Sequence, residues 1–506
     1  MTRFAQDGRD GRDGRDGPAR RLPRVRQFMT VPTVSAVLFA LSALPAFAQA
    51  PTTPPPVAAP AGLKLPPIQL AKLPNGLSLR LVEMHEVPLV QATLRVKGGG
   101  RLDGDRSGLA SFTANLLDEG AGDRDAFGIA EQAAFLGADI GTTADWDYLV
   151  VNLNTPKRTL GDALDLMADV ALRPTFKSAD VSRERDLRLA QIIQQRDQPG
   201  GMATLAFGAI VFPAAHPYHR PLGGDSAAVV RFDSATVRSF YTRVFRPDQA
   251  ELVITGDITM AEARAEVSRR FGRWIPNRMA VLRPPVPAPL PRPARRTVCL
   301  VDKPGAAQSV IMIGSPGVSR TNPDYPAIEV MNTILGGSFS SRLNQNLRET
   351  KGYTYGAGSG FTYRPVPGPF VARAAVRTDV TDSSLVEFFK ELNSIRDSAV
   401  SEIELERARN YIVFGLPGEF ETTGQMASQV AELLTFGLPP TYFDTYVGQV
   451  RRVSRADVQR VARQYFDPAQ VDVVVVGDVE KIRPGIEALG LGPVTVRDLE
   501  GREVGR

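Results

Sequence analysis

Arg348 and Tyr355 are the two residues of this chain whose types and spacing best suit binding of a peptide carbonyl group. They lie seven residues apart in the segment 347–355. Gly352 follows the arginine and can end a helix, and alternate residues from 353 to 357 then share one face of an expected strand. A guanidinium group and a phenol both donate hydrogen bonds. We therefore expect the pair to hold and orient a carbonyl oxygen.

Residue types that bind metals are scarce in this sequence. It has three histidines and one cysteine, which excludes an intramolecular disulfide and a cysteine-based zinc or redox site. Cys299 lies in an apolar stretch that is typical of a strand, and we expect a core thiol. His216 and His219 form the only close histidine pair, but Pro217 between them predicts a loop, so we expect no metal there. His85 is expected at the surface.

The bulk composition narrows the function classes. A chain of 506 residues exceeds what one core usually organises, so we expect two or more domains. The hydrophobic content of 43% and charged content of 23% are typical of globular protein. The formal net charge is +5, but residues 1–48 hold eight Arg and four Asp. The remainder is close to neutral, so no nucleic-acid partner is expected.

Residues 1–48 have the features of a leader rather than of a folded domain. Repeated Arg-Asp-Gly units form a low-complexity tract. Four arginines then precede an apolar stretch over residues 34–44, which is too short to span a bilayer, and a small-x-small site precedes Gln49. These features predict a secretory signal peptide, an exported, periplasmic protein and no transmembrane anchor. Residues 49–61 read as a Pro-rich leader.

Two segments repeat each other at a constant offset of 221 residues. Segment 237–258 contains a helix-like stretch, an aromatic-x-Pro turn, an apolar strand and Gly-Asp, and segment 458–479 repeats that order. We predict an α+β fold of two homologous halves related by a pseudo-twofold repeat, each a mixed, mainly antiparallel sheet with helices packed on it. The predicted boundaries are 62–280 for the N-terminal half, 281–295 for a Pro-rich linker, 296–490 for the C-terminal half and 491–506 for a tail.

Several motifs resemble the inverzincin peptidases, the pitrilysin-like and insulinase-like zinc peptidases that include mitochondrial processing peptidase. These motifs are Leu-Pro-Asn-Gly-Leu at 73–77, Val-Lys-Gly-Gly-Gly at 96–100, Gly-Leu-Ala at 108–110, and the segment 212–223. The resemblance spans residues 66–480. It implies two similar α+β halves that face each other across a closed or half-closed chamber.

The metal-binding motif of that family is degenerate here. Family members that cleave peptides carry H-x-x-E-H on a helix after Gly-Leu-Ala, where two His bind zinc and the Glu activates water. The matching window contains Ser111, Ala114 and Asn115 instead, and the third ligand, a Glu about 76 residues further on, corresponds to Gln191. These four side chains are neutral or inert. The resemblance therefore implies no bound metal and no catalytic residue in this chain alone.

The second half keeps residues that the family uses for substrate. The resemblance implies that Arg348 and Tyr355 face the zinc across the chamber, position the substrate and stabilise the developing oxyanion. Gly336 and Gly337 lie in a segment that resembles the glycine-rich segment of two-subunit members. The alternative interpretation is that Arg348 pairs with Glu349 or another neighbour at a helix end and that Tyr355 is an ordinary strand aromatic.

Together these features predict a division of labour. We expect a substrate-binding, non-catalytic subunit of a heteromeric zinc metallopeptidase, whose peptide substrates are cut by a partner inverzincin subunit with an intact H-x-x-E-H and its own zinc. The first alternative is a non-proteolytic binding or assembly subunit of a larger complex. The second is a self-sufficient peptidase that uses other metal ligands.

Overall fold

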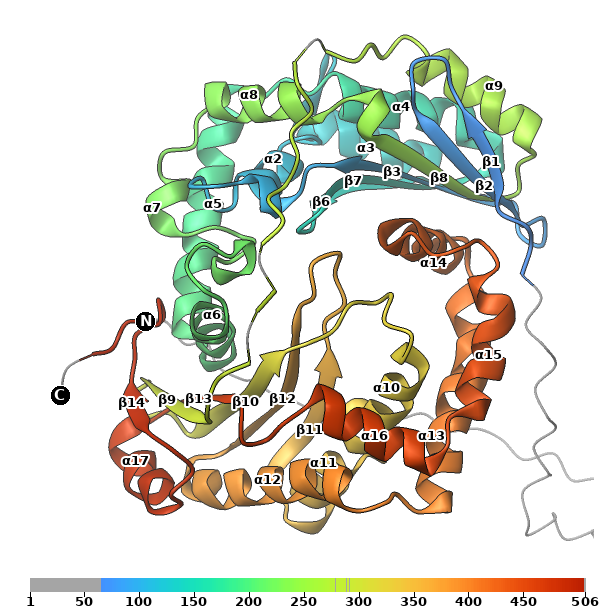
Figure 1. Cartoon of the computed structure of the whole chain (residues 1–506). Helices are drawn as coiled ribbons and strands as arrows, with labels where there is room; N and C mark the ends of the chain where they lie inside the picture. Colours follow the sequence, from blue (N-terminus) through green and yellow to red (C-terminus); the bar gives the residue numbers. More distant parts are fainter. Residues whose placement is uncertain (1–64, 278, 288, 291, 505–506) are drawn as a thin grey trace, which may run out of the picture. The chain divides into compact units, whose positions relative to one another are not determined.

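The computed structural model describes residues 65–277, 279–287, 289–290 and 292–504 (Figure 1). The predicted signal peptide and the Pro-rich leader lie outside these residues. The described residues all belong to one compact unit. Within the described ranges, no helix combines the length and the apolar character needed to cross a membrane.

The first half is built on a six-stranded mixed sheet with the strand order β1-β2-β8-β3-β7-β6. β2 and β8 are parallel, and the other neighbouring strands are antiparallel. β8 is buried along most of its length, as expected for a central strand covered on both faces. The strands are β1 (Gln69–Lys72), β2 (Ser78–Glu83), β3 (Leu89–Lys97), β6 (Asp139–Ala144), β7 (Tyr148–Pro156) and β8 (Ala250–Gly256), beside a small hairpin of β4 (Gly120–Ala121) and β5 (Arg124–Asp125).

The second half is built on a second six-stranded sheet with the order β11-β12-β10-β13-β9-β14. β9 is parallel to both β13 and β14, and the remaining pairs are antiparallel. Cys299 lies in β9 and is 2% exposed, which confirms the expected core thiol. The strands are β9 (Thr297–Asp302), β10 (Gln308–Pro316), β11 (Thr354–Phe361), β12 (Pro369–Arg377), β13 (Asp472–Gly477) and β14 (Val494–Val496).

The two sheets confirm the predicted repeat. β7 and β12 begin and end 221 residues apart, as do α8 (Ser234–Val244) and α16 (Arg455–Tyr465). When the second sheet is read from β14 to β11, its strand order also matches that of the first sheet, and β8 corresponds to β13. The edge strands differ, because β1 is antiparallel to β2 whereas β14 is parallel to β9. β14 lies beyond residue 490, so the second sheet includes part of the segment predicted as a tail.

Helices cover both sheets (Figure 1). In the first half they are α2 (Leu109–Asn115), α3 (Ala126–Leu136), α4 (Leu160–Leu172), α5 (Ser178–Asp197), α6 (Pro199–Val211), α7 (Ser226–Val229), α8 and α9 (Met260–Phe271). In the second half they are α10 (Tyr325–Asn332), α11 (Arg342–Asn344), α12 (Thr381–Asp397), α13 (Glu402–Gly415), α14 (Thr423–Phe436), α15 (Tyr442–Arg452), α16 and α17 (Val479–Ala488). Two π-helical segments, η6 (Thr333–Gly337) and η7 (Gln345–Thr350), flank α11.

Each half has a large apolar core, and a third core joins them. Met202, Ala206 and Phe207 of α6 pack with Met312 and Val474 of the second sheet. In return, α14 of the second half packs against β3 and β8 of the first sheet. Each sheet is thus covered on one face by a helix from the other half (Figure 1). This exchange ties the halves together across their apolar faces.

Candidate functional site

α2, which carries three of the degenerate metal-site positions, is held at its start by a buried carboxylate. Asp103 accepts hydrogen bonds of 2.8 Å from the backbone N–H groups of Gly108 and Ala110. Burial raises the pKa of Asp103 to about 7, although these two backbone hydrogen bonds lower it. Gly108 has φ +91°, and a Cβ there would lie 2.6 Å from Gly224 Cα. The glycines of the recognised motifs therefore allow a close contact of two loops at this helix.

A buried polar group joins α2 to α5. Arg188 donates hydrogen bonds to Ser111 Oγ (2.8 Å) and to the carbonyl oxygen of Gly223 (3.1 Å), and it pairs with Glu184 at 3.4 Å. Asn115 completes the connection by donating to Glu184 Oε1 at 3.0 Å. Arg188 and Glu184 are each 6% exposed. We call Ser111, Asn115, Glu184 and Arg188 the α2–α5 cluster.

The α2–α5 cluster does not fit a zinc ion. Zinc sites in proteins use imidazole, thiolate or carboxylate donors, and here Glu184 is the single anionic donor. Its carboxylate already pairs with the guanidinium group of Arg188, which remains positively charged at any physiological pH. Among the described residues, no group of three or more His, Cys, Asp or Glu side chains is placed to hold a metal ion.

The four degenerate positions do not form one site in the structure. Ser111 and Asn115 both belong to the cluster, as expected for residues one helical turn apart. Ala114 is fully buried in the apolar core, and Gln191 is exposed, with a side chain that forms no hydrogen bond in the described part of the chain. Glu184, not Gln191, is the α5 residue that contacts Asn115.

Glu184 and Arg188 are not among the site residues that the sequence predicts. Both lie on α5, the helix that also carries Gln191, and they are four residues apart. Opposite charges at this spacing usually indicate an exposed ion pair. Here the pair is buried. The spacing of the two charges in the sequence does not distinguish a buried ion pair from an exposed one.

The histidines lie where the sequence predicts. His216 directly precedes a 3-10 turn, Pro217–His219, and His219 is its last residue. His216 is 5% exposed and stacks on Phe212, and burial lowers its pKa to about 4. His85 is exposed, and its hydrogen bond to Asp257 raises its pKa.

Arg348 and Tyr355 are both accessible but are not bonded to each other. Arg348 lies in η7, 4.6 Å above the ring of Phe339 and 3.5 Å from Glu349. Gly352 has φ +64° and donates to the carbonyl oxygen of Arg348, so it ends this helical turn as predicted. Tyr355 is 91% exposed. The ion pair with Glu349 therefore exists and still leaves the guanidinium group partly open to solvent.

The expected alternation along β11 is wrong at its start. The pairing of β11 with β12 shifts between Thr354 and Ala357. Tyr355 is exposed whereas Ala357 is 9% exposed, so these two residues do not share a face. A β-bulge inserts an unpaired residue and changes the face of the residues that follow it, and a pattern of alternate residues could not reveal it.

Gly336 and Gly337 have a packing role in the described structure. A Cβ at Gly336 would lie 2.3 Å from the backbone nitrogen of Ser359 in β11. Beside it, Asn332 donates to the carbonyl oxygen of Ser359 at 3.1 Å. A Cβ at Gly337 would lie 2.8 Å from Nδ2 of Asn332. These glycines let η6 contact the outer edge of β11, and substrate contact by them stays a prediction.

A groove borders the strand that carries Tyr355. It has a volume of about 800 Å³ and lies between the start of α6 and the second sheet. Gly356 and Gly358 of β11 line it without side chains, and Arg373 lines it without an ion pair among the described residues. The groove thus offers bare backbone and a positive charge next to Tyr355.

Two carboxylates fix the segment that contains Arg348, and they predict a pH dependence. Burial raises the pKa of Glu387 and Glu404, but hydrogen bonds outweigh it and lower both to about 2. Asn346, Lys351 and Lys390 donate the hydrogen bonds to Glu387. Arg342 is the main hydrogen-bond donor to Glu404.

We expect the double variant Glu387→Gln/Glu404→Gln to unfold about 2 kcal/mol more easily at about pH 7. Because the folded pKa values lie below the ordinary value of 4.5, the stabilisation is complete above that pH and is lost as the pH falls toward about 2. Urea unfolding between about pH 3 and 7 should show the difference between parent and variant shrinking with acid. A constant difference would contradict this assignment.

These features define a class of protein: a two-half, peptidase-like chain with an arginine between the helices that would bear the metal ligands. Residues 81–212 match the family model described as insulinase (peptidase family M16), and residues 231–412 match the model described as peptidase M16 inactive domain. The chain belongs to the insulinase family, peptidase family M16. The resemblance noted in the sequence is confirmed.

Relatives agree with this assignment. An uncharacterized zinc protease of Mycobacterium bovis is 27% identical over 397 residues, 77% of this chain and 89% of that protein. One of Streptomyces coelicolor is 24% identical over 363 residues, 71% of this chain and 78% of that protein. The crystal structure of a peptidase M16 inactive domain from Pseudomonas fluorescens has a TM-score of 0.75 at 25% identity and covers 81% of this chain and 97% of its own.

A protease from Helicobacter pylori has the same TM-score of 0.75, at 19% identity, and covers 81% of this chain and 100% of its own. At this identity it supports the fold alone. The predicted fold class, two mixed sheets with helices packed on them, is confirmed.

Proposed function

We propose that this chain is the exported, non-catalytic, substrate-binding subunit of a heteromeric zinc metallopeptidase. The α2–α5 cluster carries this proposal. In it, the guanidinium group of Arg188 contacts Ser111 of α2 and Glu184 of α5. These two helices match those that carry the zinc ligands in the family's peptide-cleaving members. A partner chain with an intact H-x-x-E-H would supply the zinc and the base.

The chain itself would bind and orient the peptide. Arg348 and Tyr355 are accessible donors that can bind carbonyl oxygens. The groove beside Tyr355 gives room for an extended segment. In the first half, β6 is an edge strand that packs against α2. An extended peptide can pair with such an edge through backbone hydrogen bonds.

The test uses the complex that co-purifies with this chain, identified by mass spectrometry. We expect the complex to hydrolyse peptides in a chelator-sensitive manner and the isolated chain to be inactive. Arg348→Ala and Tyr355→Phe should each lower kcat/KM of the complex by about 10- to 100-fold, since each removes a hydrogen bond to a developing charge. Arg264→Ala, which changes an exposed α9 residue with no ion pair among the described residues, is the control.

Two outcomes would contradict this proposal. Chelator-sensitive hydrolysis by the isolated chain would mean that it holds a metal of its own. A stable complex without proteolysis, whether or not Arg348 is present, would favour the alternative of a non-proteolytic assembly subunit. Export is tested separately by N-terminal sequencing of the mature chain, which should begin near Gln49.

A further inference from the structure

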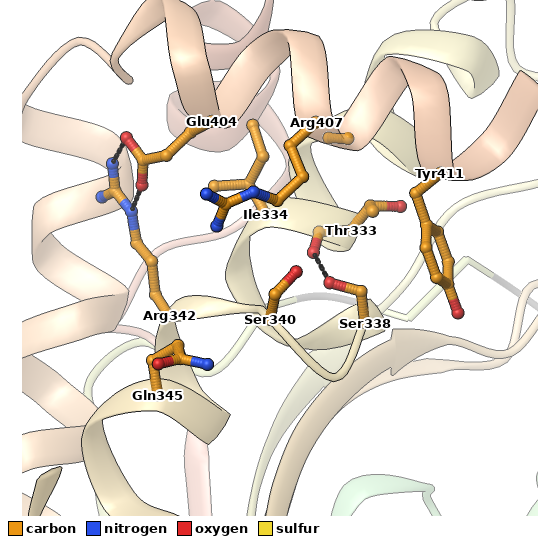
Figure 2. A pocket seen from close by; sticks show the side chains of 10 residues that line it. Thr333, Ile334, Ser338, Ser340, Arg342, Gln345, Glu404, Arg407 and Tyr411 are labelled. Atoms are coloured by element: carbon orange, nitrogen blue, oxygen red, sulfur yellow. Dashed lines mark hydrogen bonds and ion pairs between the residues drawn. The ribbon is translucent and has the colours of Figure 1, made fainter. Parts of the chain in front are cut away.

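A small pocket in the second half shares the Arg342–Glu404 ion pair with the site described above, but its other lining residues have had no role so far. It has a volume of about 190 Å³ and lies between α13 and the segment that joins η6 to η7 (Figure 2). We call it the Arg407 pocket. Its lining residues are Thr333, Ile334, Ser338, Ser340, Arg342, Gln345, Glu404, Arg407, Ala408 and Tyr411.

One wall of the Arg407 pocket is a neutral ion pair. Arg342 donates two hydrogen bonds to Glu404, at 2.7 and 3.1 Å, and a third to Ser394 Oγ at 3.2 Å. Glu404 also accepts hydrogen bonds of 2.9 Å from the backbone N–H and the hydroxyl of Ser401. The carboxylate of Glu404 is therefore fully engaged and does not neutralise a second cation.

Several donors on the pocket are unused. Figure 2 shows the Arg407 side chain reaching over the pocket from α13, with Ser340 and Gln345 below it. Within the described residues, the side chains of Arg407, Ser340, Gln345 and Tyr411 form no hydrogen bond or ion pair. The pocket therefore has one uncompensated positive charge together with neutral groups that can donate hydrogen bonds.

The surroundings of the pocket are apolar. Ile334 and Ala408 line it and are 5% and 2% exposed. Two large apolar residues that adjoin lining residues in the sequence are exposed, Phe339 (65%) and Ile403 (72%), and so is Phe414 (40%), one helical turn after Tyr411. Ile403, Arg407, Tyr411 and Phe414 follow helical spacing, so they form one face of α13. A small inorganic anion would not contact these exposed apolar side chains, whereas a larger ligand with an apolar group would.

We propose that the Arg407 pocket binds a carboxylate group carried by a polypeptide with an apolar residue beside it. A guanidinium group binds a carboxylate through two parallel, charge-assisted hydrogen bonds, and the pocket volume suits a single residue. The carboxylate can be a C-terminal chain end or a Glu or Asp side chain. Only residues of the second half form this pocket, and the proposal does not depend on the proposed subunit role.

The test measures binding of three short peptides to the full chain by ligand-observed NMR: Ac-Ala-Ala-Ala-Leu with a free carboxylate, its C-terminal amide, and Ac-Ala-Ala-Glu-Leu amide. We expect the free-carboxylate peptide, the Glu peptide or both to bind, and the neutral amide to bind at least about tenfold more weakly. Binding of the first alone indicates a chain end, and binding of the Glu peptide alone indicates an acidic side chain.

Variants assign the binding to the pocket. Arg407→Ala should weaken binding of the carboxylate peptides by about 10- to 100-fold, and Ser340→Asp, which places a carboxylate below Arg407, should do the same. Arg264→Ala should change nothing. All three positions are at least partly exposed, so an unchanged Tm verifies folding. Equal binding of the neutral amide, equal binding to Arg407→Ala, or no binding of either carboxylate peptide at about 10 mM would overturn the proposal.

Discussion

Replacing Arg188 with methionine is expected to lower the free energy of unfolding by about 3 to 5 kcal/mol, because it leaves the buried carboxylate of Glu184 without its cation. Arg188 also donates to Ser111 and to the Gly223 carbonyl oxygen, and these acceptors would lose a partner as well. Urea or thermal unfolding of the full chain measures the loss. The size of this effect reflects the burial of both charges.

Two further variants give this prediction a control. Arg188→Met/Glu184→Leu removes both charges together, and we expect it to recover most of the lost stability, since a buried ion pair can be replaced by apolar residues at little cost. Arg183 lies on the same helix as Arg188 and pairs with Glu119 at the surface. Arg183→Met breaks this exposed pair and should cost about 1 kcal/mol or less. A loss from Arg188→Met no larger than that from Arg183→Met would show that the cluster is solvated.

Zinc binding is expected to return only when Arg188 is removed. Ser111→His and Asn115→His place two imidazoles one helical turn apart, and Glu184 beside Asn115 supplies a carboxylate. With Arg188 intact, its positive charge repels the zinc ion. Two like unit charges about 4 Å apart repel each other by about 4 kcal/mol or more in a partly buried site. Adding Arg188→Met should therefore tighten zinc binding by about a thousandfold or more.

Competition with a chelator and elemental analysis of the purified variants measure this change. Glu184→Gln in the same background should abolish the binding if Glu184 is the third ligand, whereas rescue by Gln191→Glu would favour the position expected from the family pattern. No hydrolysis is expected from any of these variants, because Ala114 cannot act as a base. Equally tight zinc binding with Arg188 intact would refute the idea that this arginine excludes the metal.

Both predictions concern residues that lie far apart in the sequence. Arg188 and Ser111 are 77 positions apart, and Asn115 and Glu184 are 69 apart. The composition of the window at 111–115 indicates that imidazole and carboxylate ligands are missing, because this depends on residue type alone. Which side chains contact one another there depends on how α2 and α5 pack.

The features that depend on local order along the chain could be predicted from the residues alone. The 221-residue repeat predicted two halves with matching strands, the prolines predicted the turn at His216, the apolar stretch around Cys299 predicted a core strand, and Gly352 predicted a helix end. Each of these follows from backbone preference or from periodic burial, which neighbouring residues specify.

The other features depend on how distant segments of the chain pack together. It placed the charge of Arg188 between α2 and α5, moved Tyr355 and Ala357 to different faces through a bulge, gave Gly336 a packing role against β11, and formed the Arg407 pocket from segments about 60 residues apart. The physical reason is common to all four. Periodicity indicates which face of an element is buried, but the partner on that face depends on the packing of segments that are distant in the chain.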